Sequence, residues 1–234
     1  MKDIFLMDAD DTLLDFHGAS NVALIEAFEK CNLTWREHYA VEYKKCNDGL
    51  WEALERKELT RQELIEKRFS LYLSLLGIEN ADAIGTAFNE YYLSALSKSP
   101  KYMDGAEAFL QRLKKLGKIY VVTNGTAWIQ KSRFERSRLW DYIDDAFISQ
   151  EVGADKPAKA YTNYVLSHIP NFTKERALLI GDSLSADIKM ANDAKITSIW
   201  FNPENKPIKP TALPDYTAQN FTEILEIIQS LNAD

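Results

Sequence analysis

The stretch FLMDADDTLL, residues 5–14, joins a short apolar run to a cluster of three carboxylates. Asp8, Asp10 and Asp11 follow the run directly, and Thr12 closes the cluster. Adjacent carboxylates repel one another, so a fold that gathers them usually holds a cation or a proton among them. Taken alone, the cluster also suits a strand end followed by a turn, since Asp and Thr favour turns. The rest of the chain decides between these two interpretations.

Length and composition indicate an ordinary globular protein. The chain has 234 residues, 46% of them hydrophobic and 27% charged, which suffices for a core domain that carries a smaller one. Its apolar runs are far shorter than the ~18 residues of a membrane span, and the N-terminus lacks a signal-peptide pattern. Cys31 and Cys46 form no CxxC motif. We therefore expect a cytoplasmic protein with reduced thiols and no membrane partner. The net charge of −7 argues against a nucleic-acid partner.

Short apolar runs alternate with helical patterns at the start of the chain and again from about residue 104 onward. Continuous runs of β-branched and aromatic residues are typical of strands buried on both faces of a parallel sheet. Two connecting helices are predicted from caps, one after Asp104 that ends at Gly117 and one after Asn220. Residues 202–214 contain four prolines and predict an irregular connection. The predicted strands are 4–8, 118–123, 145–149, 177–182 and 197–201.

The segment between these regions has a helical pattern throughout. Residues 34–37 and 60–63 both match a capping box, in which Thr and Glu each satisfy an orphan amide at a helix start. A further helical stretch carries Phe88, Tyr91 and Tyr92. We therefore predict a helical domain over residues 17–99, inserted into an α/β core formed by residues 1–16 and 100–234.

Polar residues follow four of the predicted strands. In an open parallel sheet, ligands bind at the carboxyl ends of the strands, where strand order reverses. Each motif alone is weak, because VTNG at 122–125 suits a turn and Asp187 in GDSLSAD suits a helix dipole. A calcium loop of the EF-hand type is excluded, since Leu13 and Ala19 stand where glycine and glutamate are needed. The residues expected to share the sheet edge are Asp8, Asp10, Thr123, Asn124, Lys156 and Asp182.

Together and in this order, the motifs DADDT, VVTNG, GADKP and GDSLSAD resemble the four signatures of the haloacid dehalogenase (HAD) superfamily. The resemblance covers essentially the whole chain, including the helical cap inserted after the first strand. It implies a doubly wound, Rossmann-like parallel core with strand order 5-4-1-2-3. It also implies a magnesium-dependent enzyme that acts through an aspartyl-phosphate.

The resemblance assigns a role to each core residue. Asp8 is the nucleophile, and Asp10 is the general acid and base. Thr123, Asn124 and Lys156 hold the phosphate. Asp11 and Thr12 are expected to support the loop structurally. The implied magnesium site consists of the Asp8 carboxylate, the Asp10 backbone carbonyl and Asp182, with Asp187 orienting a bound water or serving as an outer ligand.

Within the superfamily, the spacing from DDTLLDF through NDGLW to GDSLSADIK resembles bacterial phosphatases that act as 5′-nucleotidases on pyrimidine nucleoside monophosphates. On that basis Phe16, Asn47 and Trp51 are candidate nucleoside contacts, although Trp51 equally suits the packing of a helical bundle. Two departures are expected to leave the chemistry intact. Met7 replaces a usual phenylalanine, and Lys195 stands where glycine is common, which predicts a left-handed backbone there.

Several alternatives remain at the level of the sequence. A dehalogenase shares the fold and the nucleophile but needs no acid at Asp10. A sugar-phosphate phosphatase or a phosphomutase of the same superfamily fits the motifs nearly as well. A phosphoacceptor or binding module is disfavoured by Asp10 and by the large inserted domain. The sequence leaves the physiological substrate and the oligomeric state open.

Overall fold

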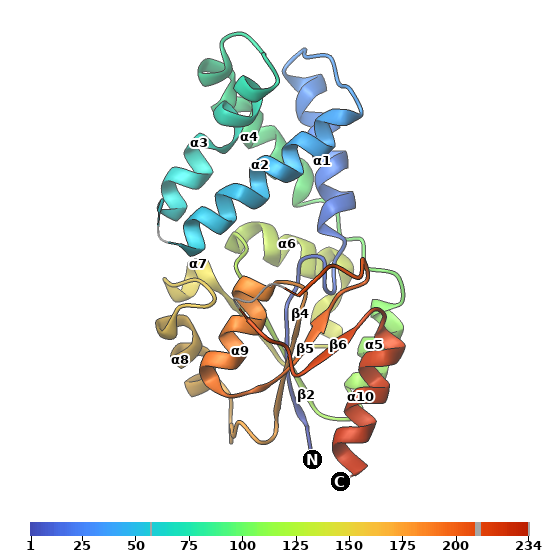
Figure 1. Cartoon of the computed structure of the whole chain (residues 1–234). Helices are drawn as coiled ribbons and strands as arrows, with labels where there is room; N and C mark the ends of the chain where they lie inside the picture. The colour runs from blue at the N-terminus through green and yellow to red at the C-terminus, as the bar shows by residue number, and fades with distance from the viewer. Residues whose placement is uncertain (57, 209–211, 234) are drawn as a thin grey trace. The chain divides into compact units, whose positions relative to one another are not determined.

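In the computed structural model, which describes residues 1–56, 58–208 and 212–233, six parallel strands form one sheet (Figure 1). The order is β3-β2-β1-β4-β5-β6, so the predicted parallel α/β core with order 5-4-1-2-3 is confirmed and gains an edge strand. That strand escaped prediction because it has three residues and buries only Ala218. It follows the proline-rich connection, of which residues 209–211 lie outside the described residues. The strands are β1 (Ile4–Met7), β2 (Lys118–Thr123), β3 (Asp145–Ile148), β4 (Ala177–Gly181), β5 (Thr197–Phe201) and β6 (Tyr216–Ala218).

Helices cover both faces of this sheet because successive residues of β1 point to opposite sides. Phe5 and Met7 pack into one core with α5 and α10, whereas Ile4 and Leu6 pack into a second core with α8 and α9. The continuous apolar strands are thus explained by burial on two sides. The helical segments of this part are α5 (Ala106–Leu113), α6 (Ala127–Ser137), η1 (Leu139–Asp141), α7 (Ser149–Val152), α8 (Lys159–His168), the π-helical turn η2 (Leu184–Ile188), α9 (Lys189–Ala194) and α10 (Phe221–Ala233).

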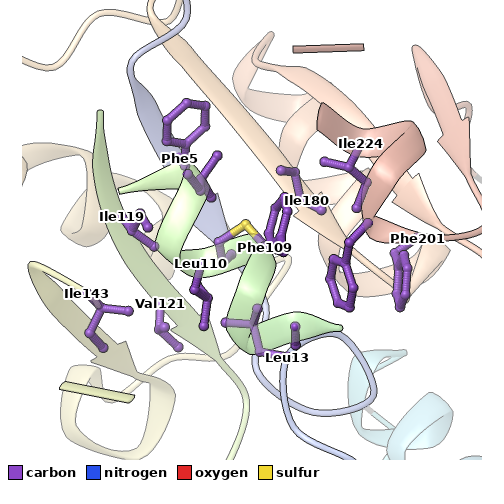
Figure 2. Close-up of a cluster of buried hydrophobic side chains, with 14 of the residues drawn as sticks. Phe5, Leu13, Phe109, Leu110, Ile119, Val121, Ile143, Ile180, Phe201 and Ile224 are labelled. Carbon is purple, nitrogen blue, oxygen red and sulfur yellow. The ribbon is translucent and has the colours of Figure 1, made fainter. Parts of the chain in front are cut away.

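Aromatic rings join the α5 and α10 side of the sheet. Figure 2 shows Phe109 of α5 among the residues of β1, β2, β4 and β5 that point to this face. The Phe109 ring stacks on Phe221 of α10 with 4.8 Å between ring centroids, and Phe221 stacks in turn on Phe201 of β5 at 4.9 Å. These contacts fix both helices against the strands whose carboxyl ends carry the polar residues.

The caps of the core helices agree only in part with the sequence. Asn220 accepts a hydrogen bond from the Glu223 amide at 3.0 Å, as predicted for α10. Lys195 has φ +57°, so the predicted left-handed position is confirmed. The helix predicted after Asp104 is present as α5, but its predicted ends were wrong, because Gly105 occupies the N-cap in a left-handed conformation without a side-chain cap, and the helix ends at Leu113.

The chain forms two compact units, one comprising Met1–Phe16 and Pro100–Asp234 and the other His17–Ser99. The second unit contains most of α1 (Phe16–Lys30), together with α2 (His38–Glu55), α3 (Arg61–Leu75) and α4 (Ala81–Leu96). Thr60 and Glu63 form the predicted capping box of α3. The box predicted at residues 34–37 is wrong, because α2 begins at His38 without a side-chain cap. Among the described residues, no helix is both long and apolar enough to cross a membrane.

Replacing Phe109 with alanine is expected to lower the free energy of unfolding by about 3–5 kcal/mol, since it removes a buried ring and leaves a cavity. Urea unfolding of the purified protein measures the effect. Leu213→Ala, at a side chain that is 66% exposed, is the control and should change stability by no more than about 0.5 kcal/mol. Equal losses in the two variants would contradict the assignment of Phe109 to the core.

Candidate active site

The loop after β1 is held by its own backbone. The Asp8 amide donates to Ile180 of β4 at 2.9 Å, which continues the sheet ladder by one residue. The amides of Leu13 and Leu14 both donate to the Ala9 carbonyl, at 2.9 and 2.8 Å, and Asp11 turns the chain with φ +57°. Both Asp8 and Asp10 are therefore set at the carboxyl end of β1.

Lys156 contacts two buried carboxylates and one backbone carbonyl. Its Nζ lies 2.6 Å from Asp8 Oδ1 and 2.7 Å from Asp187 Oδ1, and it donates to the Val122 carbonyl at 2.7 Å. The side chains of Lys156 and Asp187 are 2% and 1% exposed, and that of Asp8 is 9% exposed. All three Nζ protons thus have acceptors, which is what a buried ammonium group requires.

Asn124 fixes the backbone of Lys156. The Asn124 side-chain amide donates to the Lys156 carbonyl at 3.0 Å and accepts from the Lys156 amide at 2.7 Å. The Asn124 side chain is therefore engaged in positioning Lys156, whereas the phosphate contact predicted for Asn124 involves its backbone amide. The neighbouring hydroxyl of Thr123 accepts from the Gly125 amide at 3.1 Å.

Three carboxylates form a group that can hold a metal ion. Oxygens of Asp8, Asp182 and Asp187 all lie within 4.8 Å of one another. Asp187 is fixed because its Oδ2 accepts from the Ser183 amide at 3.1 Å. Gly181 gives it room, since a Cβ at that position would lie 2.3 Å from the same oxygen.

The electrostatics of this group fit a divalent cation. Burial raises the pKa of Asp8 to about 7, with Asp187 adding to the rise and Lys156 opposing it. Burial, together with the negative charges of Asp8 and Asp187, raises the pKa of Asp182 well above its usual value. Three ionised aspartates against one lysine leave a formal charge of −2, and oxygen donors are the ligands that Mg²⁺ prefers.

Asp10 is held by two residues that the sequence did not single out. Its Oδ2 accepts from Gln130 Nε2 at 2.9 Å, and its Oδ1 pairs with Arg133 Nη1. Gln130 and Arg133 lie three residues apart on α6, and both are 1% exposed. Their only signal in the sequence is two long polar side chains among the buried positions of an amphipathic helix.

The remaining predicted residues have more ordinary surroundings. Thr12 is fully buried, and its hydroxyl has no hydrogen-bond partner within the described part of the chain. Phe16 is the first residue of α1 and the last residue of the segment Met1–Phe16 of the first unit. In the helical unit, Asn47 accepts from the Tyr43 hydroxyl at 3.4 Å, and the Arg61 guanidinium lies 5.3 Å from the centroid of the Trp51 ring.

The chain is similar to known hydrolases along most of its length. The family model of haloacid dehalogenase-like hydrolases matches residues 2–195. The chain is 37% identical to the HAD-hydrolase YfnB of Bacillus subtilis, over 97% of this chain and 95% of YfnB. It is 34% identical to the pyrimidine 5′-nucleotidase PynA of Streptococcus pneumoniae, over 95% and 93% of the two chains. Identity to the pyrimidine 5′-nucleotidase YjjG of Escherichia coli is 28%, over 97% of each.

The same relationship holds in three dimensions. A crystal structure of YfnB bound to magnesium superposes with a TM-score of 0.90 at 36% identity, covering 97% of this chain and 98% of YfnB. This chain belongs to the family of haloacid dehalogenase-like hydrolases. The predicted family and the prediction of an enzyme are therefore confirmed.

We expect Asp182→Asn to raise the melting temperature of the metal-free protein at pH 8 and to remove most of the stabilisation by Mg²⁺. A carboxyl group whose pKa is raised by folding stabilises the fold when protonated, and this contribution is lost as pH rises through the folded pKa. The wild type should therefore lose more stability than the variant between pH 5 and pH 8. In the wild type, Mg²⁺ at a hundredfold excess over its Kd should add about 2.7 kcal/mol.

Thermal unfolding with and without Mg²⁺ measures both effects. Asp193→Asn, at a carboxylate paired with Lys189 at 3.0 Å and half exposed on α9, is the control that should respond to Mg²⁺ like the wild type. An Asp182→Asn protein that is stabilised by Mg²⁺ as strongly as the wild type would rule out the metal site.

Proposed function

We propose that this hydrolase is a magnesium-dependent phosphatase, and specifically a 5′-nucleotidase that releases phosphate from pyrimidine nucleoside monophosphates. Its relatives support a phosphoric monoester hydrolase, since PynA and YjjG are both pyrimidine 5′-nucleotidases. The observation that carries the mechanism is the buried contact of Lys156 with Asp8 and Asp187. It places a cation at a carboxylate that must meet a dianionic substrate.

Asp8 is the proposed nucleophile. A carboxylate and a phosphate monoester repel each other, so attack requires positive charge at the phosphoryl oxygens. Lys156 supplies one such charge at 2.6 Å from Asp8 Oδ1. Attack by Asp8 forms the bond to phosphorus and breaks the bond to the leaving oxygen, which gives an aspartyl-phosphate on Asp8.

The metal site is proposed to consist of the Asp8 and Asp182 carboxylates and the Asp10 backbone carbonyl. Asp187 lies in the same cluster, within reach of an outer position. Bound Mg²⁺ would neutralise charge on the phosphoryl oxygens and lower the barrier to attack. The positive charge would also offset the burial and the repulsion between carboxylates that raise the pKa of Asp8 and of Asp182.

Asp10 is proposed to serve both half-reactions. As an acid it gives a proton to the leaving alkoxide, and as a base it takes a proton from the water that cleaves the aspartyl-phosphate. The Thr123 hydroxyl and the backbone amides of Asn124 and Gly125 are proposed to hold the transferred phosphoryl group, together with Lys156. Closing the cycle returns Asp8 as a carboxylate and releases phosphate.

The helical unit, residues 17–99, is proposed to be the cap that decides which leaving group is accepted. Asn47 and Trp51 are one turn apart on α2, so they share a helix face. We propose that they contact the nucleoside, together with Phe16. A nucleobase would stack on the face of the Trp51 ring opposite Arg61, or would replace the Arg61 guanidinium on the same face.

The proposed location of the enzyme is the cytoplasm.

Phosphate release from a panel of pyrimidine and purine nucleoside monophosphates, sugar phosphates and p-nitrophenyl phosphate tests the proposed activity. Release should be fastest with the pyrimidine monophosphates, should stop with EDTA and should return with Mg²⁺. Asp8→Asn should lower kcat at least about 10³-fold, because the nucleophile is lost. A malachite green assay measures the phosphate.

The alternatives give different results in the same assay. Release confined to sugar phosphates would move the substrate assignment to that class, and isomerisation of a sugar phosphate without net release would indicate a phosphomutase. An Asp8→Asn protein with wild-type activity would contradict the proposed nucleophile.

Trp51→Ala is expected to raise KM for UMP and dTMP about 5- to 100-fold, because base–aromatic stacking contributes ~1–3 kcal/mol. KM for ribose 5-phosphate, which carries no base, should stay within about twofold. Tyr91→Ala removes another aromatic side chain of the same unit, 40% exposed, and serves as the control. Unchanged KM values for both nucleotides would remove Trp51 from the substrate site.

A further inference from the structure

We propose that Gln130 and Arg133 are positioning residues that hold Asp10 for the second half-reaction, the cleavage of the aspartyl-phosphate by water. The inference rests on the proposed function and concerns the same site. Its basis is that both carboxylate oxygens of Asp10 already accept hydrogen bonds from buried donors. Hydrogen bonds to both oxygens fix the orientation of this carboxylate.

The two partners of this ion pair differ in burial. The Arg133 side chain is 1% exposed, and a buried guanidinium requires a counter-charge. Asp10 supplies it from a side chain that is 29% exposed and so still reaches solvent. One end of the ion pair is thus fixed in the protein interior, while the other end is accessible to water.

Gln130 links Asp10 to the end of β2. Its Nε2 donates at 2.9 Å to Asp10 Oδ2 and at 2.9 Å to Thr123 Oγ1, and its Oε1 accepts from Arg133 Nη1 at 3.2 Å. Gly125 makes this reach possible, because a Cβ there would lie 2.5 Å from Gln130 Nε2. The amide therefore ties the proposed base to the proposed phosphate-binding loop.

The position of the Asp10 carboxylate matters in the second step, in which water cleaves the aspartyl-phosphate. Water attacks phosphorus, the phosphorus–oxygen bond to Asp8 breaks, and the proton of the water goes to the Asp10 carboxylate. That proton is later given to the leaving alkoxide of the next substrate, so the cycle balances. Each carboxylate oxygen has a second lone pair, which leaves Asp10 able to accept from water while Gln130 and Arg133 hold it.

p-Nitrophenyl phosphate isolates this step, because p-nitrophenolate leaves without needing a proton. If Arg133→Met misplaces the base, the second step slows and the aspartyl-phosphate accumulates. We expect kcat and KM to fall together by about 10- to 100-fold, with kcat/KM within about threefold of the wild type. Rapid mixing should show a burst of p-nitrophenol that approaches one per enzyme.

Two further variants and a control complete the experiment. Gln130→Met should show the same pattern more weakly, and Arg133→Lys should recover part of kcat because it keeps the charge. Arg136→Met alters an exposed arginine one turn along α6 and should match the wild type. Gln130→Met also serves if Arg133→Met fails to fold, as judged by circular dichroism.

The outcomes separate this inference from the proposed function. A wild-type enzyme that releases phosphate neither from the pyrimidine monophosphates nor from p-nitrophenyl phosphate would overturn both. An active wild type whose Arg133→Met and Gln130→Met variants lose kcat/KM as much as kcat, with no burst, would overturn the positioning role alone. Variants with wild-type kinetics would do the same.

Discussion

The contact on which the site depends is the buried ammonium of Lys156 between the carboxylates of Asp8 and Asp187. Removing these charges from water costs several kcal/mol per ion, so the arrangement is stable only when the whole set is present. It draws together the end of β1, the loop before α8 and the turn η2. Asp182 adds a further carboxylate, and the excess negative charge makes the site suited to a divalent cation.

Close backbone approach is the second constraint on the site. Gly181 and Gly125 each leave the space that a neighbouring side chain fills, Asp187 in one case and Gln130 in the other. The glycines of the GDSLSAD and VTNG motifs therefore make room for two side chains of the proposed site. Both motifs also end strands that flank β1, which explains why the parallel sheet can gather them at one edge.

The strands β1, β2, β4 and β5 were predictable because they are buried on both faces along most of their length and therefore have continuous apolar runs. In β3 only Phe147 and Ile148 are buried, which is still enough for a short apolar run. β6 has only one buried residue, and so it carries no such pattern. Local cap motifs were less reliable. The capping box at Thr60 and the side-chain cap at Asn220 formed, but Thr34 and Asp104 do not cap their helices, because a motif of four residues also suits a turn.

By itself the sequence determined the parallel core, the family and the order in which Asp8, Asp10, Thr123, Lys156 and Asp182 follow the strands. Those features are local, since strand burial and strand-end residues can be read along the chain. Only the tertiary structure decided that Asn124 clamps the Lys156 backbone and that Gln130 and Arg133 hold Asp10. Asp10 and Arg133 are 123 residues apart, and such a pairing leaves no periodicity or spacing in the sequence, because folding alone brings the partners together.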